Sequence, residues 1–450
     1  MNADDLASDV KDDTQKTSPG KIDQAGQKVL AKVARRLIPY MFSLYILSYL
    51  DRINVSFAGL QMYDDLKMTD SDFGLGLAIF FIGYFIFGAP GNMVMERIGA
   101  RRWICAIMVV WGAITMALAL ANSIHSFYAL RFLLGAAEAG FFPGMILYLT
   151  YWFPEKQRGL AVAKFMAAIP AAGVLGGLIS AKILEMGGFM GLAGWKWLFI
   201  ITGFPSILMG IVTWFFLTDR PQYANWLTAD EKTWLSETID KEKQSCASDK
   251  SVKLFTRETS ATLALLSLLY FSLTLGMYGF QLWLPQIIKG FGGLSDSMTA
   301  LVTVIPAIFQ ALGMMVIAGS SERTGERRVH VAVSAIIAAA GFILTIFMTN
   351  PWMALVTLSI TAFGIWGTVG PFWSLGTSLL PSKIKAPGIG FINSTGNLGG
   401  FVGPNVVGIV KEASGNFHAG LYTMAASLLL AACLSFFSEK LLKRGTRIGS

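Results

Sequence analysis

The chain has 450 residues, of which 54% are hydrophobic and only 14% are charged. A soluble domain carries about 25% charged residues, so this composition excludes an ordinary soluble protein and predicts an all-α membrane protein. The formal net charge of +8 would suggest nucleic-acid binding in a soluble chain. Here the Lys and Arg residues lie at the ends of apolar runs, as the positive-inside rule requires. We therefore expect contact with the lipid bilayer and no nucleic-acid partner.

The residues that commonly build metal, disulfide or haem sites are scattered along the chain. They are Cys105, Cys246, Cys433, His125, His330 and His418. Their spacing fits neither a metal site nor a disulfide framework, and the sequence contains no nucleotide-binding loop. We expect no metal, no cofactor and no enzymatic activity.

Residues 1–34 come first and are polar with mixed charge. No apolar segment follows the start, so we expect a disordered cytoplasmic tail rather than a signal peptide. Apolar runs of about 20 residues, long enough to cross a bilayer, then follow. There are twelve, at about 37–57, 73–95, 103–121, 126–152, 158–181, 196–217, 258–281, 297–320, 330–349, 352–379, 386–410 and 418–440.

A hydrophilic segment at 218–257 separates the sixth run from the seventh. We expect it to be a cytoplasmic linker between two pseudo-symmetric six-helix bundles, at 35–217 and 258–441, with a cytoplasmic tail at 442–450. Loops rich in Lys and Arg fall on one side if the number of spans is even, which predicts that both termini are cytoplasmic. Within the linker, Thr228 and Glu231 fit a capping box at the start of a short surface helix.

A short charged motif occurs once in each predicted bundle. It reads Glu96-Arg-Ile-Gly-Ala-Arg-Arg102 and returns as Glu322-Arg-Thr-Gly-Glu-Arg-Arg328, 226 residues later. Such a repeat is typical of carriers in which one half rocks against the other. We expect the motif to gate the cytoplasmic side by holding neighbouring helix ends, with a glycine at the tight turn. The alternative is simple positive-inside anchoring. The candidate gating residues are Glu96, Arg97, Gly99, Arg101, Arg102, Glu322, Arg323, Gly325, Arg327 and Arg328.

The same offset relates glycines in the fifth and eleventh spans. Gly173 corresponds to Gly399, and Gly177 corresponds to Gly403. Because small residues allow close approach of helices, we expect all four to line the contact between the halves. Generic small-residue packing is the alternative.

Four charged residues stand out inside the predicted spans, where each is a functional candidate because a charge in the bilayer is costly. Asp51 and Arg52 lie in the first span, and Arg131 and Glu138 in the fourth. A rise of ~1.5 Å per residue puts Asp51 and Arg131 at a similar depth, so we predict that they pair. The alternative is that the four charges form a structural ion network.

Adjacent residues of a helix point about 100° apart, so Arg52 faces a different environment from Asp51. We assign Arg52 to a substrate cavity, on one face with Tyr45 and Ser48. There Arg52 would bind a carboxylate by charge-assisted hydrogen bonds. Glu138 and Asp51 would load and release protons, with Arg131 as a partner of Asp51.

The second half offers neutral hydrogen-bonding and aromatic groups instead of charges. We expect Tyr278, Gln281, Trp373, Ser374 and Asn393 to contact the substrate, together with Tyr84 in the second span. Such groups suit the recognition of hydroxyls or of an aromatic ring. For each of them, hydrogen bonding between helices is the alternative.

The motif loops resemble the signature loop of the major facilitator superfamily. The string from Pro90 to Arg102, the segment Tyr49-Leu-Asp-Arg-Ile-Asn54, the run from Arg131 to Gly140, and Tyr151-Trp-Phe-Pro-Glu155 resemble its anion:cation symporters. That family includes carriers of sugar acids, tartrate and hydroxyphenylacetate, and sialin. The resemblance implies that Arg52 contacts a carboxylate, that the acids take up protons, and that Trp373 and Asn393 lie at substrate-binding positions.

The sequence therefore predicts a monomeric carrier that imports an organic anion by proton symport, in a bacterial inner membrane. The anion could be a sugar acid, a small hydroxy-dicarboxylate or an aromatic acid. Sodium coupling, facilitated transport and a ligand sensor that does not transport remain alternatives. Arg52 argues against a cationic drug as the substrate.

Overall fold

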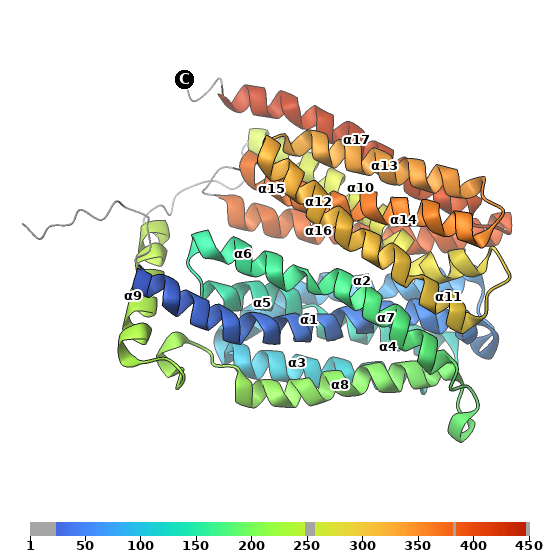
Figure 1. Ribbon diagram of the computed structural model, residues 1–450, viewed down its shortest axis with the longest axis horizontal. Coiled ribbons are helices and arrows are strands. Elements are labelled where there is room, and N and C mark those ends of the chain that lie inside the picture. Colours follow the sequence, from blue (N-terminus) through green and yellow to red (C-terminus); the bar gives the residue numbers. More distant parts are fainter. Residues whose placement is uncertain (1–23, 248–256, 381–383, 447–450) are drawn as a thin grey trace, which may run out of the picture.

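The computed structural model describes residues 24–247, 257–380 and 384–446, and every regular element in them is a helix. The six spans of the first half are α1 (Gln24–Leu66), α2 (Asp70–Ile98), α3 (Ala100–Leu118), α4 (Ile124–Glu138) with α5 (Phe141–Thr150), α6 (Glu155–Met166) with α7 (Ala168–Leu184), and α8 (Gly194–Phe216). The six of the second half are α10 (Arg257–Lys289), α11 (Asp296–Val302) with α12 (Val304–Thr324), α13 (Arg327–Ile346), α14 (Pro351–Gly367) with α15 (Val369–Leu379), α16 (Lys385–Ser414), and α17 (His418–Thr446). The predicted twelve spans in two bundles are confirmed (Figure 1).

Four of the twelve spans are broken into two helices, and each break has the same local cause. In α5, α7, α12 and α15, the third residue is a proline: Pro143, Pro170, Pro306 and Pro371. Proline lacks the backbone N–H that would bond to the carbonyl four residues earlier, and its ring clashes with that carbonyl. Each proline therefore interrupts its span near the middle of the bundle.

Ten of the described spans are long and apolar enough to cross a membrane by length and composition. The other two, α1 and α16, contain the polar and glycine residues that line the boundary between the halves. Helix α1 packs against α10 of the second half, and α16 packs against α2 of the first. These two less apolar spans therefore both contact the other half, as the more apolar α7 does through α11 and α12.

The prediction of a disordered tail over 1–34 is wrong for residues 24–34, which form the start of α1. Val29, Leu30 and Val33 are buried there, and Lys32 Nζ contacts Glu231 Oε2 at 2.7 Å. An apolar face hidden among polar residues explains why the segment looked disordered. Residues 1–23 lie outside the described part of the chain.

The C-terminal boundary also needs correction, because α17 continues to Thr446, past the predicted end of the bundle at 441. The rest of the predicted tail, 447–450, lies outside the described residues.

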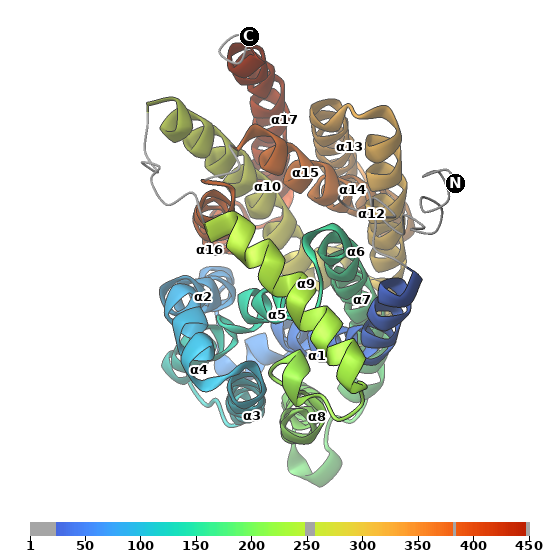
Figure 2. The same cartoon turned by 90° about the vertical axis from the view of Figure 1, so that its left-hand side faces the viewer.

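The linker contains a short 3-10 helix, η2 (Pro221–Tyr223), and helix α9 (Ala229–Ala247). The predicted capping box is confirmed: the Thr228 amide donates to Glu231 Oε2 at 2.8 Å, and the Glu231 amide donates to Thr228 Oγ1 at 3.3 Å. Two hydrogen bonds hold the pKa of Glu231 below its usual range. The one from Lys32 has the larger effect, and the one from the Thr228 amide has the next largest. Figure 2 shows α9 lying across one end of the bundle.

We call the end of the bundle that carries the Gly99 and Gly325 loops the motif side, and the other end the opposite side. The predicted role of Gly173 and Gly177 in the contact between halves is confirmed. A side chain at Gly173 would meet Ala307, and one at Gly177 would meet Val304 and the Ala300 carbonyl.

The same prediction is wrong for Gly399 and Gly403, which face α10 of their own half at Phe271 and Leu275. On α16, other glycines face the first half. Gly400 packs against Phe81, and Gly408 packs against Asp70 and Gly74. The offset matches positions within each bundle, but α7 and α16 use different faces to contact the other bundle.

Polar contacts join the two halves at the opposite side. Lys411 forms an ion pair with Asp70, and the Ser71 amide donates to Glu412 Oε2 at 2.8 Å. Ser297 Oγ donates to Glu185 Oε1 at 2.7 Å. These contacts hold the halves together at the opposite side.

The Asp70–Lys411 pair gives a first test. Lys411→Met keeps a long side chain but leaves Asp70 unpaired, so the opposite side should open more often. We expect Ser56→Cys, at a buried position and in a background without the natural cysteines, to react several-fold faster with a water-soluble maleimide. Lys241→Met is the matched control, because Lys241 pairs with Glu237 within one exposed turn of α9. Equal labelling rates in all three backgrounds would refute this role.

Candidate functional site

A buried ion pair lies where α1 meets α4. Arg52 Nη2 contacts Glu138 Oε2 at 3.2 Å, and the two residues are 7% and 0% exposed. Both residues are candidates from the sequence, but their pairing is not. Arg52 Nε and Glu138 Oε1 make no hydrogen bond within the described residues. The pair therefore has one free donor and one free acceptor for a bound molecule.

The predicted Asp51–Arg131 pair is wrong in this structure. Asp51 Oδ2 accepts a hydrogen bond from Ser206 Oγ at 2.7 Å, on α8. Arg131 Nε donates to the Gly76 carbonyl of α2 at 3.2 Å. The depth estimate placed the two residues at one level, but Asp51 faces α8 whereas Arg131 faces α2. Glu138 lies within electrostatic range of Asp51, Arg131 and Arg52.

Phe80 of α2 connects the two arginines. The guanidinium carbon of Arg52 lies 5.3 Å from the centre of its ring, and that of Arg131 lies 5.0 Å from it. Cation–π contacts of this kind strengthen when the groups are shielded from water, and Phe80 is fully buried. The ring thus contacts both cations, each of which lies within electrostatic range of Glu138.

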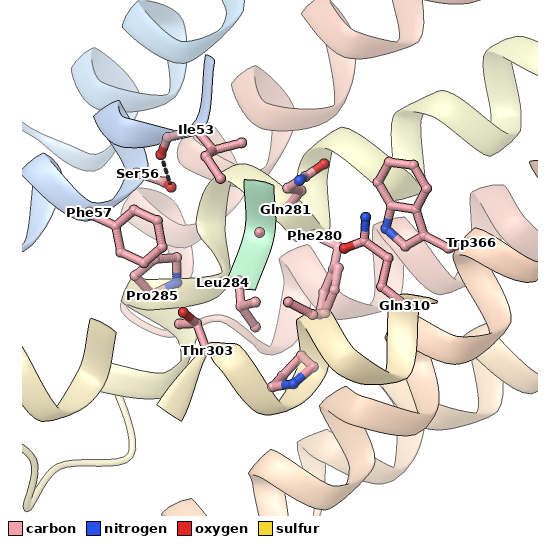
Figure 3. A pocket seen from close by; sticks show the side chains of 13 residues that line it. Ile53, Ser56, Phe57, Phe280, Gln281, Leu284, Pro285, Thr303, Gln310 and Trp366 are labelled. Carbon is pink, nitrogen blue, oxygen red and sulfur yellow. Dashed lines mark hydrogen bonds between the residues drawn. The ribbon is translucent and has the colours of Figure 1, made fainter. Parts of the chain in front are cut away.

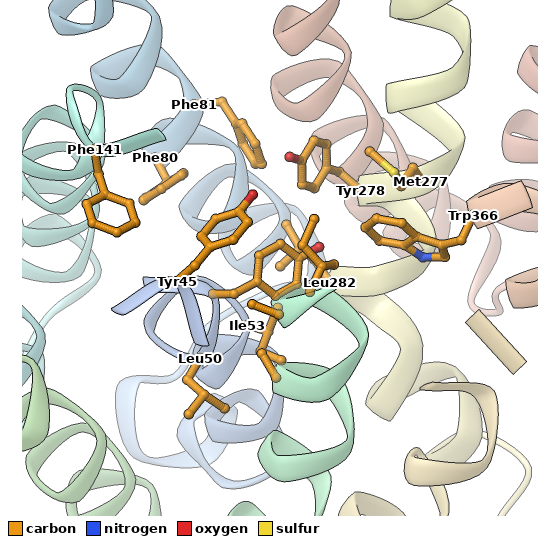
Figure 4. Close-up of a cluster of buried hydrophobic side chains, with 14 of the residues drawn as sticks. Tyr45, Leu50, Ile53, Phe80, Phe81, Phe141, Met277, Tyr278, Leu282 and Trp366 are labelled. Carbon is orange, nitrogen blue, oxygen red and sulfur yellow. The ribbon is translucent and has the colours of Figure 1, made fainter. Parts of the chain in front are cut away.

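The residues that the sequence predicts on one face of α1 lie together around the Arg52–Glu138 pair. Tyr45 lies within electrostatic range of Arg52, and Ser48 of Glu138. Tyr84 and Tyr278 complete the surroundings, since Arg52 lies 5.1 Å from the centre of the Tyr84 ring and within range of the Tyr278 hydroxyl. Figure 4 shows Tyr45 of the first half and Tyr278 of the second half converging at the boundary.

The second half lines this site with stacked aromatic rings. Tyr270 stacks on Phe372 with ring centres 4.8 Å apart, and its edge contact with Trp373 is at 5.0 Å. The Tyr270 hydroxyl is within electrostatic range of Arg52. Sequence reasoning missed Tyr270, although it shares a face of α10 with Gln281, about three turns away.

Two further candidates of the second half, Asn393 and Ser374, lie in different parts of the bundle. Asn393 is partly buried on α16, three residues before Gly396, which packs against the Tyr270 ring. The Ser374 carbonyl instead accepts a hydrogen bond from Arg327 Nη1 at 3.0 Å, near the motif-side end of the bundle. This contact ties the backbone of Ser374 to Arg327, next to the motif loop.

Gln281 forms a bridge between the halves. Its Oε1 accepts a hydrogen bond from the Tyr49 hydroxyl at 2.6 Å. Tyr49 also packs edge-on against Trp366, with ring centres 6.4 Å apart. Sequence reasoning named Gln281 but neither Tyr49 nor Trp366 as site residues, since an aromatic residue inside a span is usually packing.

The motif loops contact helix ends within their own halves. Gly99 has φ +92° and Gly325 has φ +72°, conformations that favour glycine. The Arg101 amide donates to Asp219 Oδ1 at 2.8 Å, just after α8, and Arg327 contacts α15 through Ser374. Each loop thus ties the ends of neighbouring helices on the motif side. Most of the predicted gating residues are exposed there: Glu96, Arg97, Arg102, Glu322, Arg323, Gly325 and Arg327.

Comparison with known proteins identifies this architecture. Residues 41–404 match the family model described as Major Facilitator Superfamily. A protein of Agrobacterium vitis named "Putative tartrate transporter" is 44% identical over 408 residues, covering 91% of this chain and 90% of its own. The "Quinolone resistance transporter" of Acinetobacter baumannii is 38% identical, covering 92% and 96%. The crystal structure of a bacterial homologue of the lysosomal transporter Spinster superposes with a TM-score of 0.74 at 17% identity, covering 90% of this chain and 96% of that one.

The Arg52–Glu138 pair gives a test of stability. Glu138→Leu leaves the Arg52 charge buried without its partner, which should cost about 3–5 kcal/mol. The double variant Arg52→Met/Glu138→Leu removes both charges and should regain most of that loss. Thermal unfolding of the purified protein measures both variants, with Glu237→Leu as a control on an exposed pair. Equal destabilisation of the single and double variants would show that the two charges are not coupled.

Proposed function

Because the chain belongs to the Major Facilitator Superfamily, and is therefore a multi-pass membrane transporter rather than an enzyme, we propose that it imports an organic acid anion together with protons. One observation carries the proposal. A buried arginine and a buried glutamate are paired at the boundary between the two halves. An arginine fork is the natural ligand of a carboxylate, and a carboxyl group beside it can carry a proton.

Arg52 exchanges one carboxylate partner for another, and this exchange couples proton binding to anion binding. While Glu138 is ionised, it occupies Arg52. A proton on Glu138 releases the guanidinium, and the carboxylate of the substrate takes its place, so that the site stays electrically neutral when loaded. The hydroxyls of Tyr45, Tyr84 and Tyr278 around Arg52 supply neutral hydrogen bonds that orient the anion.

Asp51 is the second proton-coupling candidate. It is fully buried and bonded to Ser206 rather than to a cation. Because Glu138 lies within electrostatic range of it, ionisation of one carboxyl opposes ionisation of the other. Arg131, close to Glu138, balances the charge of the first half when both acids are ionised.

Alternating access then requires the halves to rock around this site. The ion pair and hydrogen bonds of the opposite side hold the present state closed there. If the motif side is cytoplasmic, as the positive charge of its loops indicates, this state faces inward. In the outward-facing state the motif loops would close the other end, the gating role proposed for Glu96, Arg97, Arg101, Arg102 and the second loop. The bacterial relatives favour an inner membrane.

The relative named for quinolone resistance favours a second candidate substrate, a drug-like aromatic acid. Quinolones carry a carboxyl group, so Arg52 could bind them as well. Transport assays should therefore include a quinolone and both directions of flux.

Uptake by the purified protein in liposomes tests the proposal. We expect accumulation of a sugar acid, tartrate or an aromatic acid when an inward proton gradient is imposed without sodium. Glu138→Gln keeps the shape of the side chain but does not titrate, so it cannot carry a proton across. It should retain anion exchange and lose at least tenfold in gradient-driven accumulation. The control is Glu237→Gln, which alters an exposed glutamate. Uptake that ignores the proton gradient, or that needs sodium, would exclude proton symport.

A further inference from the structure

A pocket lies between the halves, next to the Arg52 site, and its polar groups have no role in the proposed coupling. It is lined on the first half by Ile53, Ser56 and Phe57, and on the second half by residues that include Gln281, Gln310 and Trp366. Figure 3 shows Gln310 and Trp366 together on one side of it, with Ile53, Ser56 and Phe57 across from them.

Helix α1 places this pocket beside the charged site. Tyr45, Ser48 and Arg52 form one stripe along α1, and Tyr49, Ile53 and Ser56 form the next, about 100° around the helix. Tyr49 lies in the second stripe, yet its ring centre is 5.9 Å from the Arg52 guanidinium carbon. Through its hydroxyl it reaches Gln281 at 2.6 Å. A ligand that extends from Arg52 past Tyr49 enters the pocket.

Gln310 is a buried amide with an unused donor. The residue is only 5% exposed, and its Nε2 has no hydrogen-bond partner within the described residues. An unpaired buried polar group costs about 1–3 kcal/mol. Gln281 presents a second amide, whose Oε1 is occupied by Tyr49 and whose NH₂ group therefore points elsewhere. The pocket thus contains one buried amide donor without a partner among the described residues, on Gln310, and a second, partly buried amide on Gln281.

Acceptors are present as well. The hydroxyls of Ser56 and Thr303 donate to carbonyls of their own helices, at 2.5 Å and 2.6 Å. Their hydroxyl hydrogens are thereby used, and their oxygens remain as acceptors. A lining with both donors and acceptors suits alcohol groups, which need one of each.

The lining residues carry no charge. A second carboxylate would be buried there without a cation, which is costly. An aromatic ring would leave the Gln310 amide unpaired, a strong penalty against ligands that lack a hydrogen-bonding group. Trp366 offers an apolar face for the C–H groups of a carbon chain. Of the three substrate classes that Arg52 allows, a polyhydroxy monocarboxylate fits this lining best.

We propose that this pocket is a subsite for the hydroxylated chain of a sugar acid whose carboxylate binds Arg52, with Gln310 as a specificity-determining residue. The inference rests on the proposed function, since it takes Arg52 as the anion site. The hydroxyls of the substrate satisfy Gln310 and replace Tyr49 at Gln281. Binding thereby breaks the Tyr49–Gln281 hydrogen bond, one of two that join α1 to α10 within the described residues.

Binding to the detergent-purified full chain, without a proton gradient, tests this subsite separately from coupling. Thermal-shift titrations compare gluconate with hexanoate, an acid of the same chain length without hydroxyls, and with tartrate. Gln310→Met keeps the length of the side chain and removes its amide. It should weaken gluconate about tenfold or more and leave hexanoate unchanged, and Thr303→Val should act in the same direction.

Gln286→Met is the matched control. Gln286 is also a buried glutamine between the halves, bonded to the Ser56 carbonyl at 2.6 Å, but it does not line the pocket. It should change the affinities for gluconate and hexanoate by the same factor. The subsite is overturned if Gln310→Met weakens both acids equally or neither, or if tartrate binds better than gluconate. If no carboxylic acid binds the wild-type chain, the proposed anion site itself fails.

Discussion

The buried pair of Arg52 and Glu138 is the interaction on which the rest of the site depends. Neither charge could remain in a low-dielectric bundle alone, so each stays buried because the other does. The two further charges of the first half are arranged around the same point. Phe80 packs against both arginines, and Asp51 lies within electrostatic range of Glu138. On the proposed mechanism, any ligand that enters must therefore exchange partners with this pair.

Sequence reasoning recovers the architecture because it depends on local rules. Apolar runs of the right length predict the twelve spans, a capping box predicts the start of α9, and charged loops define one end of the bundle. The four breaks follow equally locally from Pro143, Pro170, Pro306 and Pro371. The start of α1 at Gln24 was missed because its apolar face is narrow, and only packing against the linker reveals it.

The pairing inside the site could not be predicted in the same way. A count along the helices gives the depth of a residue, but the rotation of α4 decides which residue it meets. That rotation depends on close packing: a side chain at Gly135 would collide with the Phe80 carbonyl of α2, so α4 can approach α2 only along this face. Arg131 then points to α2 and Glu138 to Arg52. Similarly, the 226-residue offset maps Gly177 onto Gly403, but it does not predict which face of α16 contacts the other half. That face carries Gly400 and Gly408.

The two halves contribute different kinds of residue to the site, and this difference has a physical consequence. Among the described residues, all four buried charged side chains lie in the first half, whereas the site in the second half is made of Tyr270, Tyr278, Gln281, Gln310 and other neutral groups. When the halves rock, the second half can move past the first without separating a fully buried ion pair. The contacts that must break are hydrogen bonds such as Tyr49–Gln281 and the partly exposed Asp70–Lys411 pair at the opposite side. Substitutions in the second half can then alter which substrates are accepted beyond their carboxylate group, while the charge balance of the site stays the same. On the proposed mechanism, coupling and specificity reside in different helices, joined by α1, which carries Arg52 on one face and Tyr49 on the next.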